Sequence, residues 1–340
     1  MASCRVLVCV TLLVAPGAGS SGAPLDADSL REAADYSSGQ KGTALIVIRD
    51  GRTLLSEYSK AGRARPMRIY SGTKGFWNLA ALAAQEDGIL ELDERVAQTI
   101  PEWESEPKSS VTVRQLLNFS AGLSEAKSLH NDGWKDRDAH AIKQPLVGTP
   151  GRSYIYGPAA LQVFNEVLKR KLAKRGETPT RYLERRVLRL LGLGQQRYLA
   201  DSTGNPLLAA GFVMKATDWA RMGRVILRDG SPVLKNGMSE AFRGSSANPM
   251  FGLGFWNNRL AGIPGSREVD PEELLDLKWH QQRWSNTCLS HAAPGDLIAS
   301  VGSGGQRLYV VPSLDLIIVR QGFISKFSDG EFLRRLFGRK

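Results

Sequence analysis

A serine and a lysine three residues apart on one apolar stretch constrain this chain more than any other feature. The stretch covers residues 69–88, IYSGTKGFWNLAALAAQEDG, and contains Ser71 and Lys74. Residues at positions i and i+3 lie one above the other on a helix, so the two side chains are expected within hydrogen-bonding distance. A serine hydroxyl becomes a strong nucleophile when a neighbouring base takes its proton, and a lysine serves as that base if burial keeps its amine neutral. The spacing therefore predicts a nucleophile beside a base.

The residues around this pair predict that it is buried. Lys74 is the only charged residue in the range 69–85, and residues 76–84 are almost wholly apolar. Such a helix is buried on most sides, and Gly88 takes the position of a helix-ending glycine. The Ser-x-x-Lys tetrad also occurs by chance on surface helices, where both residues are solvated. A single charge in an apolar helix favours catalysis over that surface alternative.

The first residues form a separate segment with the pattern of a secretory signal peptide. Residues 1–5 carry a positive charge, residues 6–15 are apolar, and small residues follow up to a candidate cleavage site near residue 20. The apolar run is shorter than the roughly 18 residues that suggest a membrane span, and no later stretch reaches that length. We therefore expect residues 1–20 to be a signal peptide and the mature protein to be exported, either periplasmic or extracellular.

The formal net charge of +11 raises the question of nucleic-acid binding. The basic residues concentrate in residues 169–189, where apolar positions interrupt them, and at the C-terminus. No aromatic-studded basic groove or recognition motif accompanies them, so we interpret them as solvated helix faces. No nucleic-acid partner is expected, and the sequence leaves the oligomeric state open.

Cysteine and histidine are too few and too scattered to predict a disulfide framework or a metal site. Removal of the signal peptide leaves Cys288 alone, which we interpret as a small buried hydrophobic residue rather than a catalytic thiol. The four histidines have no zinc-ligand spacing. We expect neither a metal ion nor a cofactor.

The segment before the Ser71 helix predicts that this helix packs on a β-sheet. Residues 43–49 (TALIVIR) have the pattern of a buried strand, and residues 53–58 follow as the hairpin partner after a tight turn. A strand pair followed by a helix places Ser71 at a helix N-terminus. Free N–H groups and the helix dipole favour a developing negative charge there.

Several further motifs follow the tetrad in a fixed order. They are DGILELDE at 87–94, TVRQLLNFSAGL at 112–123 with Thr112 as a helix cap, Pro150-Gly151 with Tyr154-Ile155-Tyr156, FGLGFW at 251–256 and the segment 299–320. Together they resemble the serine β-lactamase and penicillin-binding-protein superfamily. Within it they are most similar to the class C β-lactamase-related esterases, amidases and D-aminopeptidases. The form of residues 302–306, GSGGQ, is most similar to the branch that contains nylon-oligomer hydrolases and carboxylesterases.

The resemblance implies an α/β fold of the α+β sandwich type. This fold has an antiparallel sheet of five or more strands, flanked by helices, together with an all-helical subdomain. On this chain, residues 21–75 and 211–340 are then expected to form the sheet domain, and residues 76–210 the helical subdomain. The two parts make a single intergrown catalytic unit.

The resemblance also implies a role for each residue of the catalytic site. Ser71 is the nucleophile that becomes acylated, and Lys74 and Tyr156 share the proton transfers. Either of these two can be the base, and the sequence leaves that choice open. Tyr154 is a rival to Tyr156, which we favour because of its position relative to the preceding Pro-Gly pair.

The oxyanion hole and the substrate-binding strand are expected near residue 302. The resemblance implies that the backbone N–H groups of Ser71 and Gln306 form the oxyanion hole. Ser303, Gly304 and Gly305 are implied to line the substrate, because a carbonyl group approaches glycine backbone closely. A plain glycine bulge in an edge strand is the alternative interpretation.

Two positions depart from the family pattern. Pro158 stands where an asparagine usually helps to hold the lysine, and Ser303 stands where β-lactamases have a lysine that pairs with the substrate carboxylate. Esters or small amides therefore suit the site better than β-lactams. A penicillin-recognising carboxypeptidase or β-lactamase is the alternative, and it needs another cation near Ser303, for which Arg307 is the candidate. A non-catalytic binding relative of the fold is the other alternative.

The sequence thus predicts an exported serine hydrolase that acts on a small ester, amide or peptide through an acyl-enzyme. Its apolar acyl pocket has candidate walls among the loop tryptophans, although packing roles are equally compatible with their positions. These are Trp134, Trp256, Trp279 and Trp284.

Overall fold

A six-stranded antiparallel sheet is the centre of the fold. The computed structural model describes residues 25–59 and 65–338, so the predicted signal peptide lies outside the described residues. The strand order is β2-β1-β10-β9-β8-β5, and every neighbouring pair is antiparallel. The strands are β1 (Gly42–Arg49), β2 (Arg52–Tyr58), β5 (Trp256–Asn257), β8 (Ile298–Gly302), β9 (Gln306–Val311) and β10 (Leu316–Gly322). The predicted antiparallel sheet of five or more strands is confirmed.

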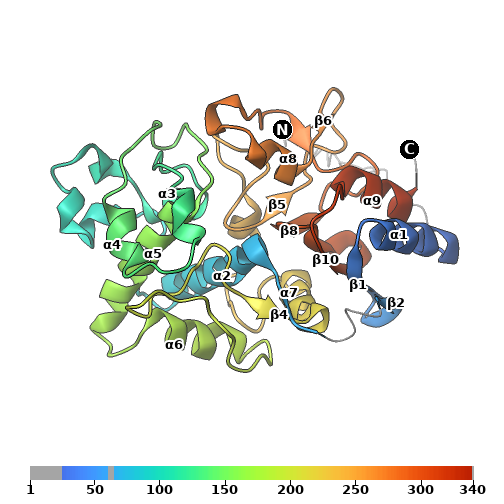
Figure 1. Ribbon diagram of the computed structural model, residues 1–340, viewed down its shortest axis with the longest axis horizontal. Coiled ribbons are helices and arrows are strands. Elements are labelled where there is room, and N and C mark those ends of the chain that lie inside the picture. Colours follow the sequence, from blue (N-terminus) through green and yellow to red (C-terminus); the bar gives the residue numbers. More distant parts are fainter. Residues whose placement is uncertain (1–24, 60–64, 339–340) are drawn as a thin grey trace, which may run out of the picture.

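Helices cover both faces of this sheet (Figure 1). The helices α1 (Ala27–Gly39) and α9 (Asp329–Phe337) pack together over one face, where Arg320 of β10 donates to Ser37. The helix α7 (Ala216–Leu227) covers the other face, where its Gly223 lies against Ile317 of β10. Residues 317 and 320 are an odd number apart on one strand and therefore point to opposite faces. Coverage of both faces explains why β1, β9 and β10 are almost continuously buried and each contains an apolar run of at least four residues.

The Ser71 helix is buried as predicted, but it begins with a different geometry. Residues 70–72 form a single 3₁₀ turn, η1 (Tyr70–Gly72), and the α-helix α2 (Thr73–Glu86) follows directly. Every residue from Thr73 to Ala84 is buried. The chain leaves the helix through Gly88, which has a left-handed φ of +62° that glycine adopts without strain. In Figure 1, α2 lies between the sheet and the group of helices on the left of the picture.

A second group of helices lies beyond α2, on the left of Figure 1. It comprises α3 (Val113–Leu117), α4 (Arg137–Ile142), α5 (Pro158–Ala173), α6 (Pro179–Leu183) and a π-helical turn (Glu184–Leu188). Three single 3₁₀ turns precede α3, at Val96–Gln98, Pro101–Trp103 and Pro107–Ser110. Another, Lys127–His130, lies between α3 and α4. Thr112 caps α3 in a capping box with Gln115, as its position in the sequence predicts. The division of the chain at residues 75 and 210 remains an interpretation.

Smaller elements complete the described chain. The strand β3 (Met67–Arg68) pairs with β4 (Val213–Met214), and β6 (Arg267–Glu268) pairs in parallel with β7 (Thr287–Cys288). The helix α8 (Pro271–Asp276) precedes the last strands, and 3₁₀ turns lie at Ser239–Phe242, Trp279–Gln281 and Pro312–Leu314. In residues 251–256 only Trp256 belongs to a strand, because Gly254 turns the chain with a φ of +78° against Asn78. None of the helices in the described ranges has the length and apolar character needed to span a bilayer.

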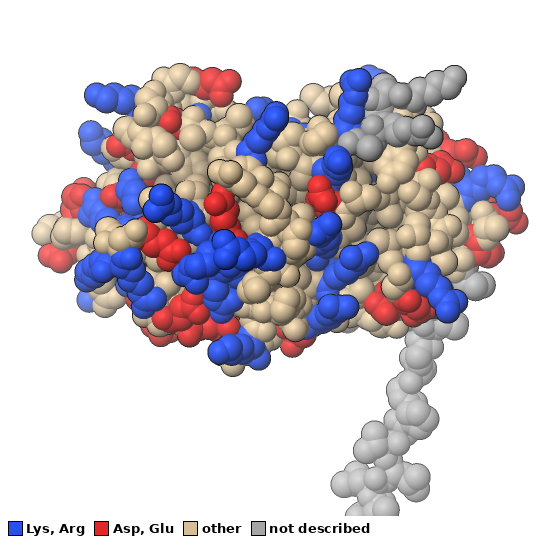
Figure 2. All heavy atoms as spheres, turned by 90° about the horizontal axis from the view of Figure 1, so that it is seen from below, with Lys and Arg blue, Asp and Glu red and all other residues tan. Residues whose placement is uncertain are grey.

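Five cations of the basic segment at residues 169–189 form ion pairs. Its cations meet carboxylates from three different parts of the chain: Lys169 meets Asp138 and Glu166, Arg170 meets Glu102, Lys171 meets Glu94, Arg185 meets Glu177, and Arg186 meets Glu86 and Asp87. Figure 2 shows basic and acidic side chains interleaved over one face of the molecule. The pairs of Arg186 join the π-helical turn to the end of α2, and those of α5 join it to α4 and to the segment after α2.

Candidate active site

Ser71 lies where the 3₁₀ turn η1 meets the end of strand β8. The preceding residue, Tyr70, has a left-handed φ of +46°, a conformation that is strained for a bulky side chain. The neighbouring Ile69 is anchored by its N–H, which donates to the Phe212 carbonyl over 3.0 Å. The end of β8 presses on the same turn, because a Cβ atom on Gly302 would lie 2.1 Å from the Ile69 carbonyl oxygen. Only glycine fits at that point, and the close approach brings β8 beside the serine.

Lys74 is a buried amine in contact with the serine. Its Nζ lies 2.7 Å from Ser71 Oγ and 2.8 Å from the carbonyl oxygen of Ala209. The side chain is 2% exposed. Burial therefore holds the pKa of Lys74 well below the usual lysine value. The geometry predicted from the Ser-x-x-Lys spacing is present, with a carbonyl group that holds the amine in place.

Tyr156 reaches the same serine from the start of helix α5. Its hydroxyl is hydrogen-bonded to Ser71, and the Lys74 Nζ lies 4.5 Å from the centre of its ring. Burial raises the pKa of Tyr156, and the hydrogen bond from Ser71 only partly offsets this rise. Tyr154 is 4% exposed and packs against Phe251 and Trp284 instead. The structure thus brings Tyr156, and not Tyr154, to the serine.

The turn between β8 and β9 carries the other predicted site residues. Ser303 is exposed, and the N–H groups of Gly304 and Gly305 donate to the two carboxylate oxygens of Glu272 over 2.9 and 3.2 Å. Glu272 lies in helix α8, so a side chain from outside the sheet fixes the shape of this turn. Both glycines have left-handed φ values, of +75° and +71°, which explains why glycine occupies both positions.

The second oxyanion donor has two candidates at this turn. Gln306 is buried, is paired with Gly302 across the hairpin, and donates its side-chain amide to the Gly322 carbonyl. Its backbone N–H as oxyanion donor stays a prediction. Ser303 directly follows Gly302, so its backbone N–H lies at the end of β8 that approaches the serine turn. We therefore add Ser303 as a second candidate.

Arg307 is committed to an internal ionic network. Its guanidinium is fully buried, lies 2.7 Å from carboxylate oxygens of both Asp329 and Glu272, and also donates to the Gly302 carbonyl. A cation held in this way supports the β8–β9 turn from behind. It does not present a free charge to a substrate at Ser303.

The two departures from the family pattern have structural counterparts. Pro158 occupies the first turn of α5, where its fixed φ suits the helix and its missing N–H costs nothing. The amine of Lys74 is held by the Ala209 carbonyl rather than by an asparagine amide at position 158. Phe119 completes the surroundings, because its ring packs against Tyr156 with the centroids 4.6 Å apart.

Sequence reasoning missed three contributors to this site: Ala209, Phe119 and Glu272. A backbone carbonyl can come from any residue, so nothing at position 209 signals its contact with Lys74. Phe119 lies within the TVRQLLNFSAGL motif, which locates it near the site without showing its role. Trp256 and Trp284, expected as candidate pocket walls, are buried and pack on each other at 5.1 Å between ring centroids.

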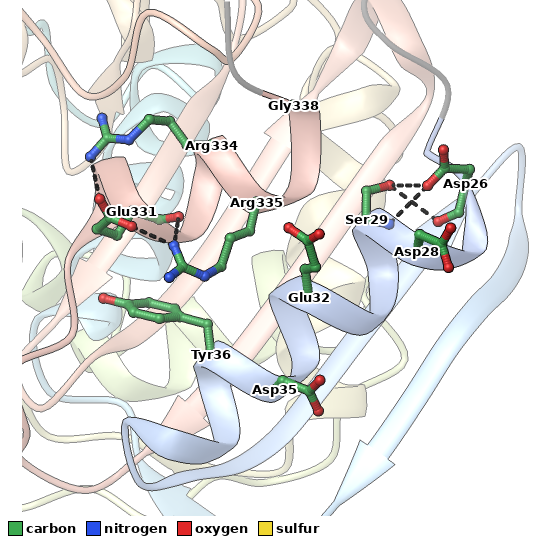
Figure 3. Close-up of a pocket in the computed structure, with 10 residues that line it drawn as sticks. All are labelled: Asp26, Asp28, Ser29, Glu32, Asp35, Tyr36, Glu331, Arg334, Arg335 and Gly338. Carbon is green, nitrogen blue, oxygen red and sulfur yellow. Dashed lines mark hydrogen bonds and ion pairs between the residues drawn. The ribbon is translucent and has the colours of Figure 1, made fainter.

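A second polar cluster in the described part of the chain differs from this site. A cavity of about 750 Å³ lies between α1 and α9, with Glu32 and Asp35 on one side (Figure 3). Its basic residues Arg334 and Arg335 are both paired with Glu331. Within residues 25–59 and 65–338, no group of three or more His, Cys, Asp or Glu side chains is arranged to hold a metal ion.

The arrangement at Ser71 contains the parts that acyl transfer requires. A hydroxyl is placed beside a buried amine and a phenol, at the N-terminus of a helix and beside a glycine-rich strand end. Together with the antiparallel sheet, this defines the fold class of serine β-lactamases and penicillin-binding proteins.

Comparison with known proteins agrees with that class. The family model described as Beta-lactamase matches residues 27–320, so the chain belongs to the beta-lactamase family. Among solved structures, EstCE1 is described as a hydrolase with promiscuous acyltransferase activity. Its superposition covers 92% of this chain and 99% of EstCE1, with 17% sequence identity and a TM-score of 0.67. The superposition with a class C beta lactamase from Rhodobacter sphaeroides covers 90% of this chain and 97% of that protein, with 16% identity and a TM-score of 0.63. The superposition with a family VIII carboxylesterase covers 93% of this chain and 97% of that protein, with 16% identity and a TM-score of 0.62. A search of curated proteins found no significant match.

Proposed function

We propose that the protein is an exported serine hydrolase that cleaves esters or small amides through an acyl-enzyme on Ser71. The observation that carries this proposal is the 2.7 Å contact between the Ser71 hydroxyl and the buried amine of Lys74. A lysine is costly to bury, and a structural role does not require it to contact a serine at a helix N-terminus.

The first half of the reaction forms the acyl-enzyme. Ser71 Oγ attacks the acyl carbon while its proton moves to the amine of Lys74. The resulting ammonium is stabilised by the Ala209 carbonyl and by the face of the Tyr156 ring. The negative oxygen of the tetrahedral intermediate is held by the Ser71 N–H and by an N–H from the β8–β9 turn.

The following steps release the leaving group and then restore the serine. Tyr156 donates a proton to the departing oxygen or nitrogen, and the ammonium of Lys74 returns a proton to the phenolate. Water then attacks the acyl-enzyme along the same path, which frees the acid and regenerates Ser71. Two groups that hydrogen-bond the same serine suit this exchange.

Burial favours Lys74 as the base and Tyr156 as the acid. It lowers the pKa of Lys74 and raises the pKa of Tyr156, which favours the neutral form of each group. A neutral amine accepts a proton and a neutral phenol donates one. The proposal therefore takes Lys74 as the base, a choice that the sequence leaves open.

Esters and small amides suit the site better than β-lactams. A β-lactam carboxylate requires a cation along the substrate strand, and Arg307 is instead buried in its pairs with Glu272 and Asp329. Among the structural neighbours, one is described as a carboxylesterase and another as a hydrolase with acyltransferase activity. A penicillin-directed activity remains the alternative, because a class C beta lactamase shares the fold.

Hydrolysis of p-nitrophenyl acetate and of a chromogenic cephalosporin by the mature protein tests the proposal. We expect turnover of the ester, little or none of the cephalosporin, and loss of ester turnover in Ser71→Ala. Ser56→Ala, an exposed serine on β2, is the matched control and should behave as wild type. Cephalosporin turnover above ester turnover would favour the alternative, and no turnover of either substrate would contradict a hydrolase.

A further inference from the structure

An apolar cavity adjoins the serine turn, and neither Lys74 nor Tyr156 belongs to its lining. Its volume is about 430 Å³, within the range of small-molecule pockets. It is lined by Met67, Arg68, Tyr70, Gly304, Gly322, Phe323 and Ile324. Tyr70 directly precedes the nucleophile, and Gly304 belongs to the turn that carries the candidate oxyanion donors.

The far wall of this cavity is apolar and exposed. Phe323 is 57% exposed and Ile324 is 77% exposed, the highest value among large hydrophobic side chains in the described part of the chain. Single exposed apolar residues are common on protein surfaces. Two adjacent ones that line a cavity beside a nucleophile are of the kind that marks a ligand site.

The backbone joins this wall to the catalytic turn. Ile324 follows strand β10, and its backbone nitrogen would lie 3.4 Å from a Cβ atom placed on Gly304. Gly304 itself is fixed by Glu272. The position of the apolar wall relative to Ser71 is therefore set by the sheet and not by a long loop.

The position of the cavity indicates which part of a substrate enters it. The departing group must contact the proton donor, and Tyr156 and Lys74 lie outside the lining of the cavity. The acyl group extends from the carbonyl carbon away from the departing group. The lining includes Tyr70, which precedes the nucleophile, and Gly304 of the β8–β9 turn, and it includes neither of the two proton-transfer residues.

We infer that this cavity binds the hydrocarbon chain of the acyl group, so that the preferred substrates are esters of unbranched, uncharged acyl groups longer than acetyl. The inference rests on the proposed function and adds the acyl specificity. Arg68 is the only charged residue in the lining, and its guanidinium lies 5.6 Å from the centre of the Tyr70 ring. The guanidinium is thus engaged with the face of the Tyr70 ring.

A series of p-nitrophenyl esters from acetate to octanoate tests the inference with the mature protein. Each methylene that becomes buried should raise kcat/KM by up to about fourfold, the equivalent of about 0.8 kcal/mol. We expect the hexanoate to acetate ratio of kcat/KM to be at least about 10 in the wild type. In Phe323→Ser combined with Ile324→Ser, that ratio should fall toward 1.

The ratio is measured within each protein, so partial loss of folded enzyme does not affect it. Leu54→Ser, which removes an exposed apolar side chain from β2, is the matched control and should keep the wild-type ratio. Equal rates for all chain lengths would overturn the inference, as would an unchanged ratio in the double variant or a preference for the half-ester of adipic acid. These results leave ester hydrolysis by Ser71 intact. Absence of acetate hydrolysis would instead overturn the proposed function and, with it, the inference.

Discussion

The amine of Lys74 and the hydroxyl of Ser71 are 2.7 Å apart at a point where the amine has almost no contact with solvent. Burial favours the uncharged amine, which is the form able to take a proton from the serine. The same burial makes the lysine a cost to the folded state. Activity and stability should therefore respond in opposite directions when it is replaced.

Replacement of Lys74 by methionine tests this opposition. We expect kcat/KM for p-nitrophenyl acetate to fall by about 10²- to 10⁴-fold, the usual contribution of a general base. The folded pKa of Lys74 is lowered, so the buried amine weakens folding at neutral pH. An apolar side chain of similar length should raise the melting temperature by about 1–2 °C for each kcal/mol gained. Calorimetry and kinetics on the same sample measure both. A variant that loses stability along with activity would contradict the account.

The pH dependence of the reaction reports the state of Lys74. Catalysis needs the neutral amine, so kcat/KM should fall as the pH is lowered through the pKa of Lys74, which lies well below the usual value of 10.5. Tyr156 acts as the neutral phenol and its pKa is raised, so no alkaline loss is expected below its ordinary value of 10.0. Tyr156→Phe should lower kcat more than it raises KM. An acid limb at the ordinary lysine pKa would show that another group is the base.

Glu272 is expected to position the β8–β9 turn for catalysis. Glu272→Gln removes the charge that accepts two glycine N–H groups and pairs with Arg307. Small misplacements in an active site cost up to about 100-fold in rate, so we expect kcat to fall by about 10-fold or more with little change in KM. Glu273→Gln, at the exposed neighbouring position, is the matched control and should leave kcat unchanged. Equal kcat values in both variants would remove Glu272 from the account.

Asp270 should make the stability of the fold depend on pH. Burial, together with the charge of Asp329, raises the pKa of Asp270 from 3.8 to about 7. A raised pKa means that the folded protein binds an extra proton in this window, so the contribution of Asp270 to stability is lost as the pH rises from about 4 to about 7. Asp270→Asn should therefore increase the melting temperature relative to wild type more at pH 8 than at pH 5. The same difference at both pH values would contradict the raised pKa.

Local sequence signals predicted much of the fold. The burial of α2 follows from its single charge, the start of α3 follows from the Thr112 cap, and the strand at residues 43–49 follows from its apolar run. In each case neighbouring residues determine the structure. The pairing of Ser71 with Lys74 belongs to the same group, because the two residues are only three positions apart, across the junction of η1 and α2.

Contacts between distant parts of the chain account for what the sequence did not predict. Ala209, whose carbonyl contacts Lys74, lies 135 positions after that lysine. Glu272 lies roughly 200 positions after Ser71. Neither residue belongs to a recognisable motif. The segment 251–256 has strand-forming residues, yet Gly254 packs against Asn78 of α2 and turns the chain. The β8–β9 turn has the predicted glycines, but the partner that fixes them comes from α8.

Intact mass of the mature protein after incubation with a fluorophosphonate tests the central claim most directly. The account predicts one added phosphonyl group on the wild type and none on Ser71→Ala, with circular dichroism showing that both proteins are folded. Ser56→Ala should be labelled like the wild type. An unlabelled but folded wild type, or equal labelling of Ser71→Ala, would contradict Ser71 as the nucleophile.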